Sequence, residues 1–384
     1  MTVFAGGKIE AFVGPAELGA ADNLEQVIID FIGGAKRHLD IAVQELDSEP
    51  IAQAILDARF RGVSVRMVLE QDYLVTAKVP KITPQRGEDA SAARRRVQWG
   101  LEGGRRSLEP NRTILSALLR CNVDVKADYN PAIFHQKFII RDFRERAFPS
   151  SAILSGSANF TTTDCHNNLN HIVIFHDARI CRTYTTEFAQ MRTGQFGRGA
   201  HGKVPSAYNL NGVPVKVLFA PDHAPELEII KQMLKATKRV DFAIFTFSGS
   251  SGIDDAMIAL AAAKRSVSGA VDPGQGVQAW AATHDLDRAR IELFFPKDVD
   301  GFGKLHHKLM VIDEDVVIAG SFNYTAPANL YNDENIFVIG SPYPDLPKRE
   351  GGPVNPEACA ELARFFRTEI KRIEASGERF AVSR

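Results

Sequence analysis

Apolar positions along this chain follow strand and helix periods in an order that occurs twice. Residues 8–15 read as a short strand ending at proline, residues 24–32 place apolar side chains on one helical face, and residues 37–43 form a buried strand. The second half repeats the series over residues 215–221, 227–234 and 238–244. The pattern therefore predicts a duplicated fold, with one copy in each half of the chain.

Further elements extend the repeat. The pattern predicts a helix over 51–58, strands over 63–69, 123–127, 138–140, 291–295 and 309–312, and closing amphipathic helices around residues 180–188 and 362–373. Strands that alternate with helices favour an α/β sandwich built on a mixed or parallel sheet. We expect domains at 1–192 and 214–384, joined by a linker at 193–213 that is rich in glycine and polar residues.

The first half carries about 30 extra residues, which map to about residues 71–110. This insertion is rich in arginine and includes Arg86, Arg94, Arg95, Arg96, Arg105 and Arg106. It is either a solvated surface excursion or an arm that binds phosphate backbones. Five acidic residues in the same segment weaken the second interpretation without removing it: Asp72, Glu88, Asp89, Glu102 and Glu109.

Composition restricts the function classes only coarsely. The chain has 384 residues, 45% of them hydrophobic, which is enough for a large core and two domains. A formal net charge of -1 gives no overall basic surface, so a polyanionic partner would need local patches. Four scattered cysteines suggest neither a zinc site nor a disulfide framework. No signal peptide or membrane-spanning run is seen, and we expect a cytoplasmic protein.

Two stretches repeat an unusual set of polar residues. Residues 135–142 and 306–313 both follow H-x-K-x4-D, and G-S-x-N follows each at 156–159 and 320–323. The repeated residues are His135, Lys137, Asp142, Ser157 and Asn159 in the first half, and His306, Lys308, Asp313, Ser321 and Asn323 in the second. Because residues i and i+2 of a strand share a face, each histidine should point the same way as its lysine. Such a set can surround one phosphate with donors.

These motifs resemble those of the phospholipase D superfamily, over nearly the whole chain apart from the insertion and the linker. The resemblance implies duplicated α/β domains related by a pseudo-twofold axis, with one active site at their interface. It implies two-step phosphoryl transfer through a phosphohistidine, without cofactor or metal. The lysines and asparagines would then bind the non-bridging oxygens, with Ser157 and Ser321 as further donors, while Asp142 and Asp313 support the motif loops.

The resemblance also suggests which histidine attacks. Aligning the two halves places Glu334 opposite Asn170. In the superfamily an acidic residue at this position supports the histidine of the other half, which pairs Glu334 with His135 and Asn170 with His306. A carboxylate fixes the tautomer and stabilises the imidazolium better than an amide does. We therefore expect His135 to be the nucleophile and His306 the general acid.

We interpret four other histidines as structural. His166, His171 and His176 lie near the first motif but lack its spacing, and His307 should point to the face opposite His306. The continuation of each motif, G-S-x-N-[FY]-T, is similar to the nuclease branch of the superfamily and favours a nuclease acting on DNA or RNA. The alternative is a phospholipase D or phosphatidyl transferase, which should carry apolar loops near the site; Phe294, Phe295 and Phe302 are the candidates. A phosphate-binding scaffold would not need both histidines. Two motifs in one chain make a dimer unnecessary without excluding an oligomer.

Overall fold

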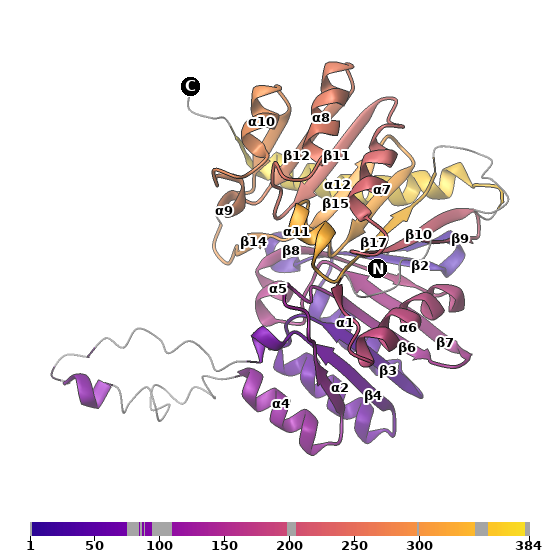
Figure 1. The fold of residues 1–384 in the computed structure, drawn as a ribbon, viewed down its shortest axis with the longest axis vertical. Helices are drawn as coiled ribbons and strands as arrows, with labels where there is room; N and C mark the ends of the chain where they lie inside the picture. The colour runs from indigo at the N-terminus through magenta and orange to yellow at the C-terminus, as the bar shows by residue number, and fades with distance from the viewer. Residues whose placement is uncertain are drawn as a thin grey trace.

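The computed structural model describes residues 2–74, 84, 87, 89–93, 110–197, 205–297, 299–341 and 352–380. The arginines named in the insertion lie outside the described residues. The chain folds into two α/β halves stacked along the long axis of the molecule (Figure 1). The fold class expected from the sequence is confirmed.

The first half is built on a mixed sheet whose strands run in the order β1-β2-β8-β7-β6-β3-β4-β5. Its strands are β1 (Thr2–Phe4), β2 (Ile9–Gly14), β3 (His38–Val43), β4 (Ser64–Leu69), β5 (Asp124–Ala127), β6 (Lys137–Phe143), β7 (Ala147–Gly156) and β8 (Asn168–Phe175). Its helices are α1 (Leu24–Gly33), α2 (Glu49–Phe60), α4 (Pro110–Arg120), α5 (Thr162–His166) and α6 (Ala178–Arg192).

The second half repeats this arrangement, since the order β10-β17-β16-β15-β11-β12-β13 matches β2-β8-β7-β6-β3-β4-β5 strand for strand. Its strands are β9 (Ser206–Leu210), β10 (Val213–Ala220), β11 (Arg239–Ile244), β12 (Ser266–Val271), β13 (Glu292–Phe295), β14 (Lys304–Leu305), β15 (Lys308–Ile312), β16 (Val316–Gly320), β17 (Glu334–Ile339) and β18 (Glu378–Arg379). Its helices are α7 (Pro225–Met233), α8 (Ile253–Ala262), α9 (Pro273–Gly276), α10 (Thr283–Arg288), α11 (Ala326–Leu330) and α12 (Pro356–Ser376).

Local signals account for many element boundaries. The Asn23 side chain caps α1 by accepting a hydrogen bond from the backbone N–H of Gln26 at 3.0 Å. Ser48 caps α2, and Asn355 caps α12, whose first residue is Pro356. These polar residues satisfy N–H groups that have no partner inside the helix.

One sequence-based expectation needs correction. The segment 193–213, interpreted as a linker, contains β9, which pairs antiparallel with β10. The two strands are joined through Asn211 and Gly212, both with positive φ (51° and 89°). An Asn-Gly pair favours this kind of tight hairpin turn. The chain therefore joins the second sheet before the expected end of the linker.

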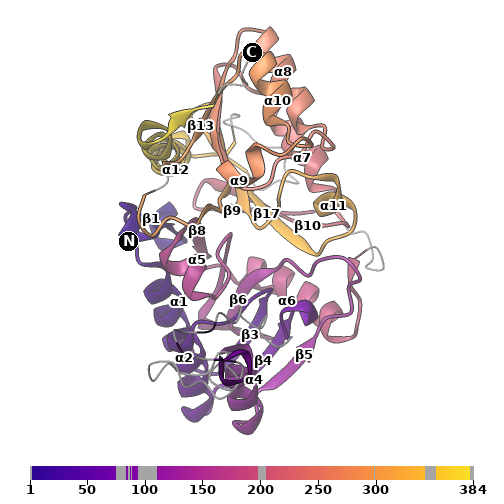
Figure 2. The same ribbon diagram turned by 90° about the vertical axis from the view of Figure 1, so that its left-hand side faces the viewer.

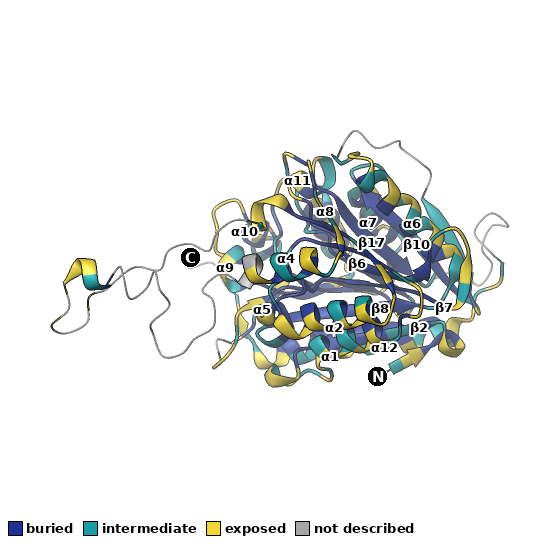
Figure 3. Ribbon diagram, turned by 90° about the horizontal axis from the view of Figure 1, so that it is seen from below, coloured by how far each residue is buried: buried dark blue, intermediate teal, exposed yellow. Residues whose placement is uncertain are grey.

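Among the residues that the structure describes, buried hydrophobic side chains form three clusters. One, with α1 and α2, lies on one face of the first sheet, and a second, with α7 and α8, lies on one face of the second sheet. The third joins residues of both sheets to α6 and α12, including Phe138, Tyr184, Phe219 and Phe366. Figure 3 shows buried strands beneath helices whose outer faces are exposed. The shared cluster makes the two halves one folded body and fixes the boundary at which the motifs meet (Figure 2).

Candidate active site

Each motif histidine is held by the backbone of the opposite half. The N–H of His135 donates to the carbonyl oxygen of Asp333 at 3.0 Å, and the N–H of His306 donates to that of Leu169 at 2.9 Å. Short parallel pairings lie beside both contacts: Phe134 bridges Asp333, and β14 pairs with the start of β8. The pseudo-twofold relation of the halves therefore extends to the histidine loops.

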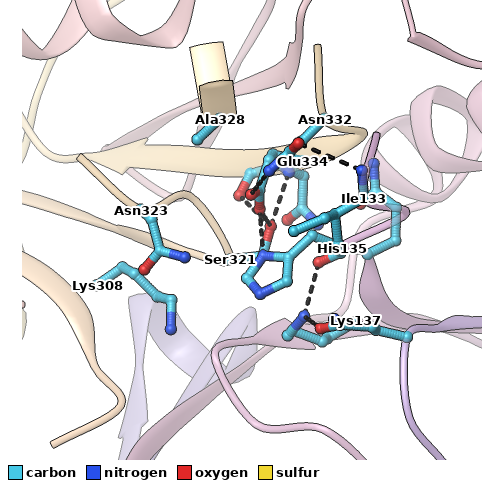
Figure 4. Close-up of polar contacts among 12 residues, drawn as sticks. Ile133, His135, Lys137, Lys308, Ser321, Asn323, Ala328, Asn332 and Glu334 are labelled. Carbon is cyan, nitrogen blue, oxygen red and sulfur yellow. Dashed lines mark hydrogen bonds and ion pairs between the residues drawn. The ribbon is translucent and has the colours of Figure 1, made fainter. Parts of the chain in front are cut away.

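The side chains of the two histidines also cross the interface. Nδ1 of His135 lies 2.7 Å from Oε2 of Glu334 (Figure 4), and Nδ1 of His306 lies 3.0 Å from Oδ1 of Asn170. The pairing expected from the alignment of the two halves is therefore present as a contact. Since a carboxylate oxygen and an amide oxygen both accept, each neutral histidine carries its hydrogen on Nδ1. Each Nε2 then keeps its lone pair.

Asn170 is fixed in this orientation. Its Nδ2 donates to the backbone oxygens of Asp164 at 2.9 Å and of Asn168 at 3.3 Å. Its Oδ1 therefore has to be the atom that faces His306. Ser157 Oγ also donates to this Oδ1, at 2.7 Å.

The serines of the two G-S-x-N motifs donate hydrogen bonds to the residues that hold the histidines, Glu334 and Asn170. Ser321 Oγ donates to Oε2 of Glu334 at 2.6 Å, matching the contact of Ser157 with Asn170. A hydroxyl has one hydrogen to donate. In this arrangement the hydroxyl hydrogens point at Glu334 and Asn170, and the expectation that these serines also donate to a phosphate stays a prediction. They orient the groups that hold the histidines.

Both motif lysines are buried, with exposed fractions of 1% for Lys137 and 2% for Lys308. Nζ of Lys137 donates to Oε1 of Gln44 at 2.9 Å and to the carbonyl oxygen of His135 at 2.8 Å. Nζ of Lys308 donates to the carbonyl oxygen of His306 at 2.8 Å and lies 5.0 Å from the ring centroid of Phe245. Each lysine therefore bonds to the backbone of its own motif histidine. The two lysines and the two histidines also influence one another's pKa, and together they are called the motif cluster.

The asparagines and aspartates of the motifs separate into two groups. Asn159 is fixed through its N–H, which donates to Oδ2 of Asp164 at 2.7 Å, and Asn323 Oδ1 accepts from the N–H of Thr246 at 3.4 Å. Asp142 instead accepts the backbone N–H groups of residues 36–38, and Asp313 those of residues 237–239. The aspartates hold loops, as expected, and none of these contacts reaches a motif histidine.

Burial disfavours charge throughout this cluster. The pKa of His135 is lowered well below its usual value by burial and then by Lys137 and Lys308. The pKa of His306 is lowered well below its usual value by burial and then by Lys308, Lys137 and His135. Burial lowers the pKa of Lys137 to about 8 and raises that of Glu334 to about 8. Without a bound anion the histidines are therefore neutral at neutral pH. Lys137, the hydrogen bond from Ser321 and Lys308 oppose the effect of burial on Glu334 and favour its carboxylate form, which is the form that accepts the Nδ1 hydrogen of His135. An anion would relieve the repulsion among the basic groups.

Sequence reasoning missed three features of the site. Asp164, 4% exposed, places Oδ2 3.5 Å from Nδ1 of His306. Gln44 and Phe245 occupy equivalent places after β3 and β11, and each contacts the lysine of its half. The pattern T-x-x-D at residues 161–164, which reads as a capping box, was the signal available for Asp164.

The histidines interpreted as structural have structural partners. His166 pairs with Glu17 and Glu25, and His176 with Glu10. His171 and His307 stack with an interplanar angle of 3° and place their Nδ1 atoms 3.1 Å apart. This buried pair crosses the interface beside the catalytic candidates.

The fold and these motifs define a member of the phospholipase D superfamily. The profile of the family described as "Cardiolipin synthase, PLD-like domain" matches residues 28–192 and 229–350, so the chain belongs to this family. Within the described part of the chain, no helix has the length and apolar character needed to cross a membrane.

Curated relatives match over part of their length. The chain is 30% identical to a phospholipase D of Rickettsia conorii over 131 residues, which is 33% of this chain and 60% of that one. It is 23% identical to the human mitochondrial cardiolipin hydrolase over 157 residues, 41% of this chain and 46% of that one. The chain thus spans about half to three fifths of these relatives.

One solved structure matches almost end to end. Phosphatidylserine synthase from Haemophilus influenzae has a TM-score of 0.58 at 12% identity, covering 99% of this chain and 88% of that one. At this identity the similarity shows the shared fold.

Proposed function

We propose that this protein is a phosphodiesterase that acts through a phosphohistidine, with nucleic acid as its substrate. The observation that carries the proposal is the pair of buried histidines, each with Nδ1 bonded across the interface and Nε2 left for a substrate. Two such imidazoles beside Lys137 and Lys308 have the groups needed for attack, protonation and charge neutralisation around one phosphate.

The proposed reaction has two displacements at phosphorus. Nε2 of His135 attacks and forms a P–N bond while the bond to the leaving oxygen breaks, and His306 as imidazolium gives that oxygen its proton. A water molecule then attacks the phosphohistidine, His306 takes the proton of the water, and the P–N bond breaks. Lys137 and Lys308 neutralise the charge of the non-bridging oxygens, and Asn159 and Asn323 donate hydrogen bonds that orient them. The sum is one water consumed and one phosphodiester bond cleaved.

His135 is proposed as the nucleophile because its partner is a carboxylate at 2.7 Å. Glu334 stabilises the positive charge that develops on the imidazole as Nε2 attacks. The amide of Asn170 accepts the Nδ1 hydrogen of His306 but adds no charge. Because the hydrogen-bonded partner of His306 is an amide, its imidazolium is less strongly stabilised than that of His135 and gives up its proton more readily, which suits a general acid.

Nucleic acid is preferred as substrate on two grounds. The motif continuations, Asn159-Phe160-Thr161 and Asn323-Tyr324-Thr325, are similar to those of the nuclease branch. In addition, the residues considered for apolar membrane loops are engaged within the fold: Phe295 packs on Phe380 at 4.9 Å between ring centroids, and Phe302 packs against the shared core.

Phospholipid is the second candidate, as substrate of a phospholipase D or phosphatidyl transferase. The curated relatives carry the names phospholipase D and cardiolipin hydrolase. Three apolar residues are also exposed beside the His135 loop: Tyr129 (74%), Ile133 (45%) and Tyr331 (50%). Figure 4 places Ile133 next to His135. Such residues could contact either a base or a lipid tail.

An activity panel separates the two candidates. Plasmid DNA, single-stranded RNA and phospholipid vesicles are incubated with the protein in the presence of a metal chelator. The proposal predicts cleavage of nucleic acid that is lost in His135→Ala and kept in His166→Ala, a histidine paired with Glu17 on the surface. Headgroup release with nucleic acid untouched would establish the phospholipid candidate instead, and activity only with added metal would contradict the mechanism.

A further inference from the structure

Asp164 is buried where the first motif meets the histidine of the second. Its Oδ2 lies 3.5 Å from Nδ1 of His306 and accepts the N–H of Asn159 at 2.7 Å. Its Oδ1 accepts from the side chain of Asn168, and its backbone oxygen accepts from Nδ2 of Asn170. Asp164 therefore contacts a motif asparagine and His306 through its carboxylate, and the amide partner of His306 through its backbone oxygen.

The second half has an alanine, Ala328, at the position equivalent to Asp164. Thr161 caps α5 through the N–H of Asp164, and Thr325 caps α11 through the N–H of Ala328, so residues 164 and 328 are equivalent. At two pairs of equivalent positions, the first half has Asn170 and Asp164, and the second half has Glu334 and Ala328 (Figure 4). Each histidine thus has one carboxylate near its Nδ1, supplied from a different position in each half.

We propose that Asp164 is a positioning residue for His306, which supplies the negative charge that Asn170 lacks and holds His306 as the proton donor to the leaving oxygen. This proposal rests on the proposed function. Nδ1 of His306 lies 3.0 Å from Oδ1 of Asn170 and 3.5 Å from Oδ2 of Asp164. Among the charged groups that face His306, Lys308, Lys137, His135 and Lys304 are basic, and all four disfavour an imidazolium. Asp164 opposes them.

The test compares two phosphodiesters of thymidine that differ in the leaving group. One releases p-nitrophenol, whose anion departs without a proton, and the other releases a nucleoside alcohol, which needs one. We measure kcat/KM, which reports the first displacement. In Asp164→Asn, kcat/KM should fall by about 10- to 100-fold for the alcohol, a fraction of what a general acid contributes, and by less than about 3-fold for p-nitrophenol.

Two variants complete the design. Asp47→Asn removes another carboxylate beside α5, one that accepts the N–H of Thr162, and should leave both values unchanged. Asp164→Asn/Asn170→Asp returns a carboxylate to His306 and should restore cleavage of the alcohol ester to within about 5-fold of wild type. Rescue of this kind is not expected if Asp164 only supports the loop of Asn159.

The outcomes are distinguishable. If the wild-type protein cleaves neither ester, the proposed function fails; if it cleaves both and Asp164→Asn loses the two equally, or loses neither, the positioning role fails. If Asp164→Asn does not fold, the proposal is tested instead at position 328, which is equivalent to position 164. Ala328→Asp should recover at least about a fifth of the activity lost in Glu334→Gln, and no recovery in a folded variant overturns the proposal.

Discussion

Glu334 Oε2 lies 2.7 Å from Nδ1 of His135, and the two residues come from opposite halves of the chain. Neither half alone contains both members of this pair. The carboxylate also accepts from Ser321 at 2.6 Å, so its orientation is set by the motif of its own half. Duplication of the fold has therefore produced one site in which each half completes the other.

Replacing Glu334 with glutamine should lower kcat by about 100-fold, because an amide can hold the ring of His135 but cannot stabilise its positive charge. The substrate dissociation constant should change little, since Glu334 is buried behind the histidine. Steady-state kinetics with an oligonucleotide substrate measures kcat, and an equilibrium binding titration with the same oligonucleotide in the His135→Ala background measures the dissociation constant with and without Glu334→Gln. A variant with wild-type kcat would show that the charge of Glu334 has no part in the reaction.

Anion affinity should depend on the protonation of Lys137, whose pKa is lowered to about 8 by burial. Below that pKa the ammonium is charged and available to a phosphate; above it the charge is lost. Tungstate, a phosphate mimic that stays a dianion over this range, should bind with nearly constant affinity from pH 6 to 7 and progressively more weakly above about pH 8. Calorimetric titration measures the binding, with Lys137→Met as the variant lacking the charge. Affinity that is unchanged up to pH 10 would contradict this role.

Lys308 should lower the free energy of unfolding although the reaction needs it. Its pKa is lowered well below the usual value by burial and then by Lys137, so the folded state disfavours its charge. Lys308→Met keeps the length of the side chain and removes the charge. The free energy of unfolding at neutral pH should rise by about 1 kcal/mol while activity is lost. Urea unfolding followed by circular dichroism tests this, and a lower midpoint would show that the lysine stabilises the fold.

The stacked pair His171 and His307 should behave as one unit. The N–H of Gly320 donates to Nε2 of His171 at 3.2 Å, so His171 carries its hydrogen on Nδ1 and donates it to His307. The equivalent pair across the interface is Gln136 and Asn335, joined by a hydrogen bond of 2.6 Å.

Single variants His171→Asn and His307→Gln should each destabilise the protein by about 1–3 kcal/mol, because each leaves a buried polar partner unsatisfied. The double variant copies the pair of the other half and should recover at least half of the summed loss. Urea unfolding of all four proteins gives the coupling. Strict additivity of the two losses would show that the pair is not coupled.

Much of this architecture can be predicted from the sequence because strand and helix periods are local and because the duplication presents each signal twice. The pair Asn211-Gly212 predicts the turn between β9 and β10, but the glycine-rich sequence around it favoured a linker. The pairing of Glu334 with His135 depended on aligning the two halves.

Other features depend on packing that no local pattern records. The role of the Ser157 and Ser321 hydroxyls follows from which acceptor lies within reach of each hydrogen. Asp164 sits in a helix of five residues and looks like an ordinary cap in the sequence. Asp164 lies beside His306 only because the packing of the two halves places that histidine there.

The most direct test of the account is to trap and locate the covalent intermediate. Labelled substrate is mixed with enzyme, the reaction is quenched in base within the first turnover, and peptides are mapped by mass spectrometry. The account predicts a labelled phosphoryl group on His135, absent in His135→Gln and accumulating in His306→Gln with the p-nitrophenyl ester, whose leaving group needs no proton. Label on His306 would reverse the two roles, and cleavage with no phosphohistidine at either position would contradict the mechanism.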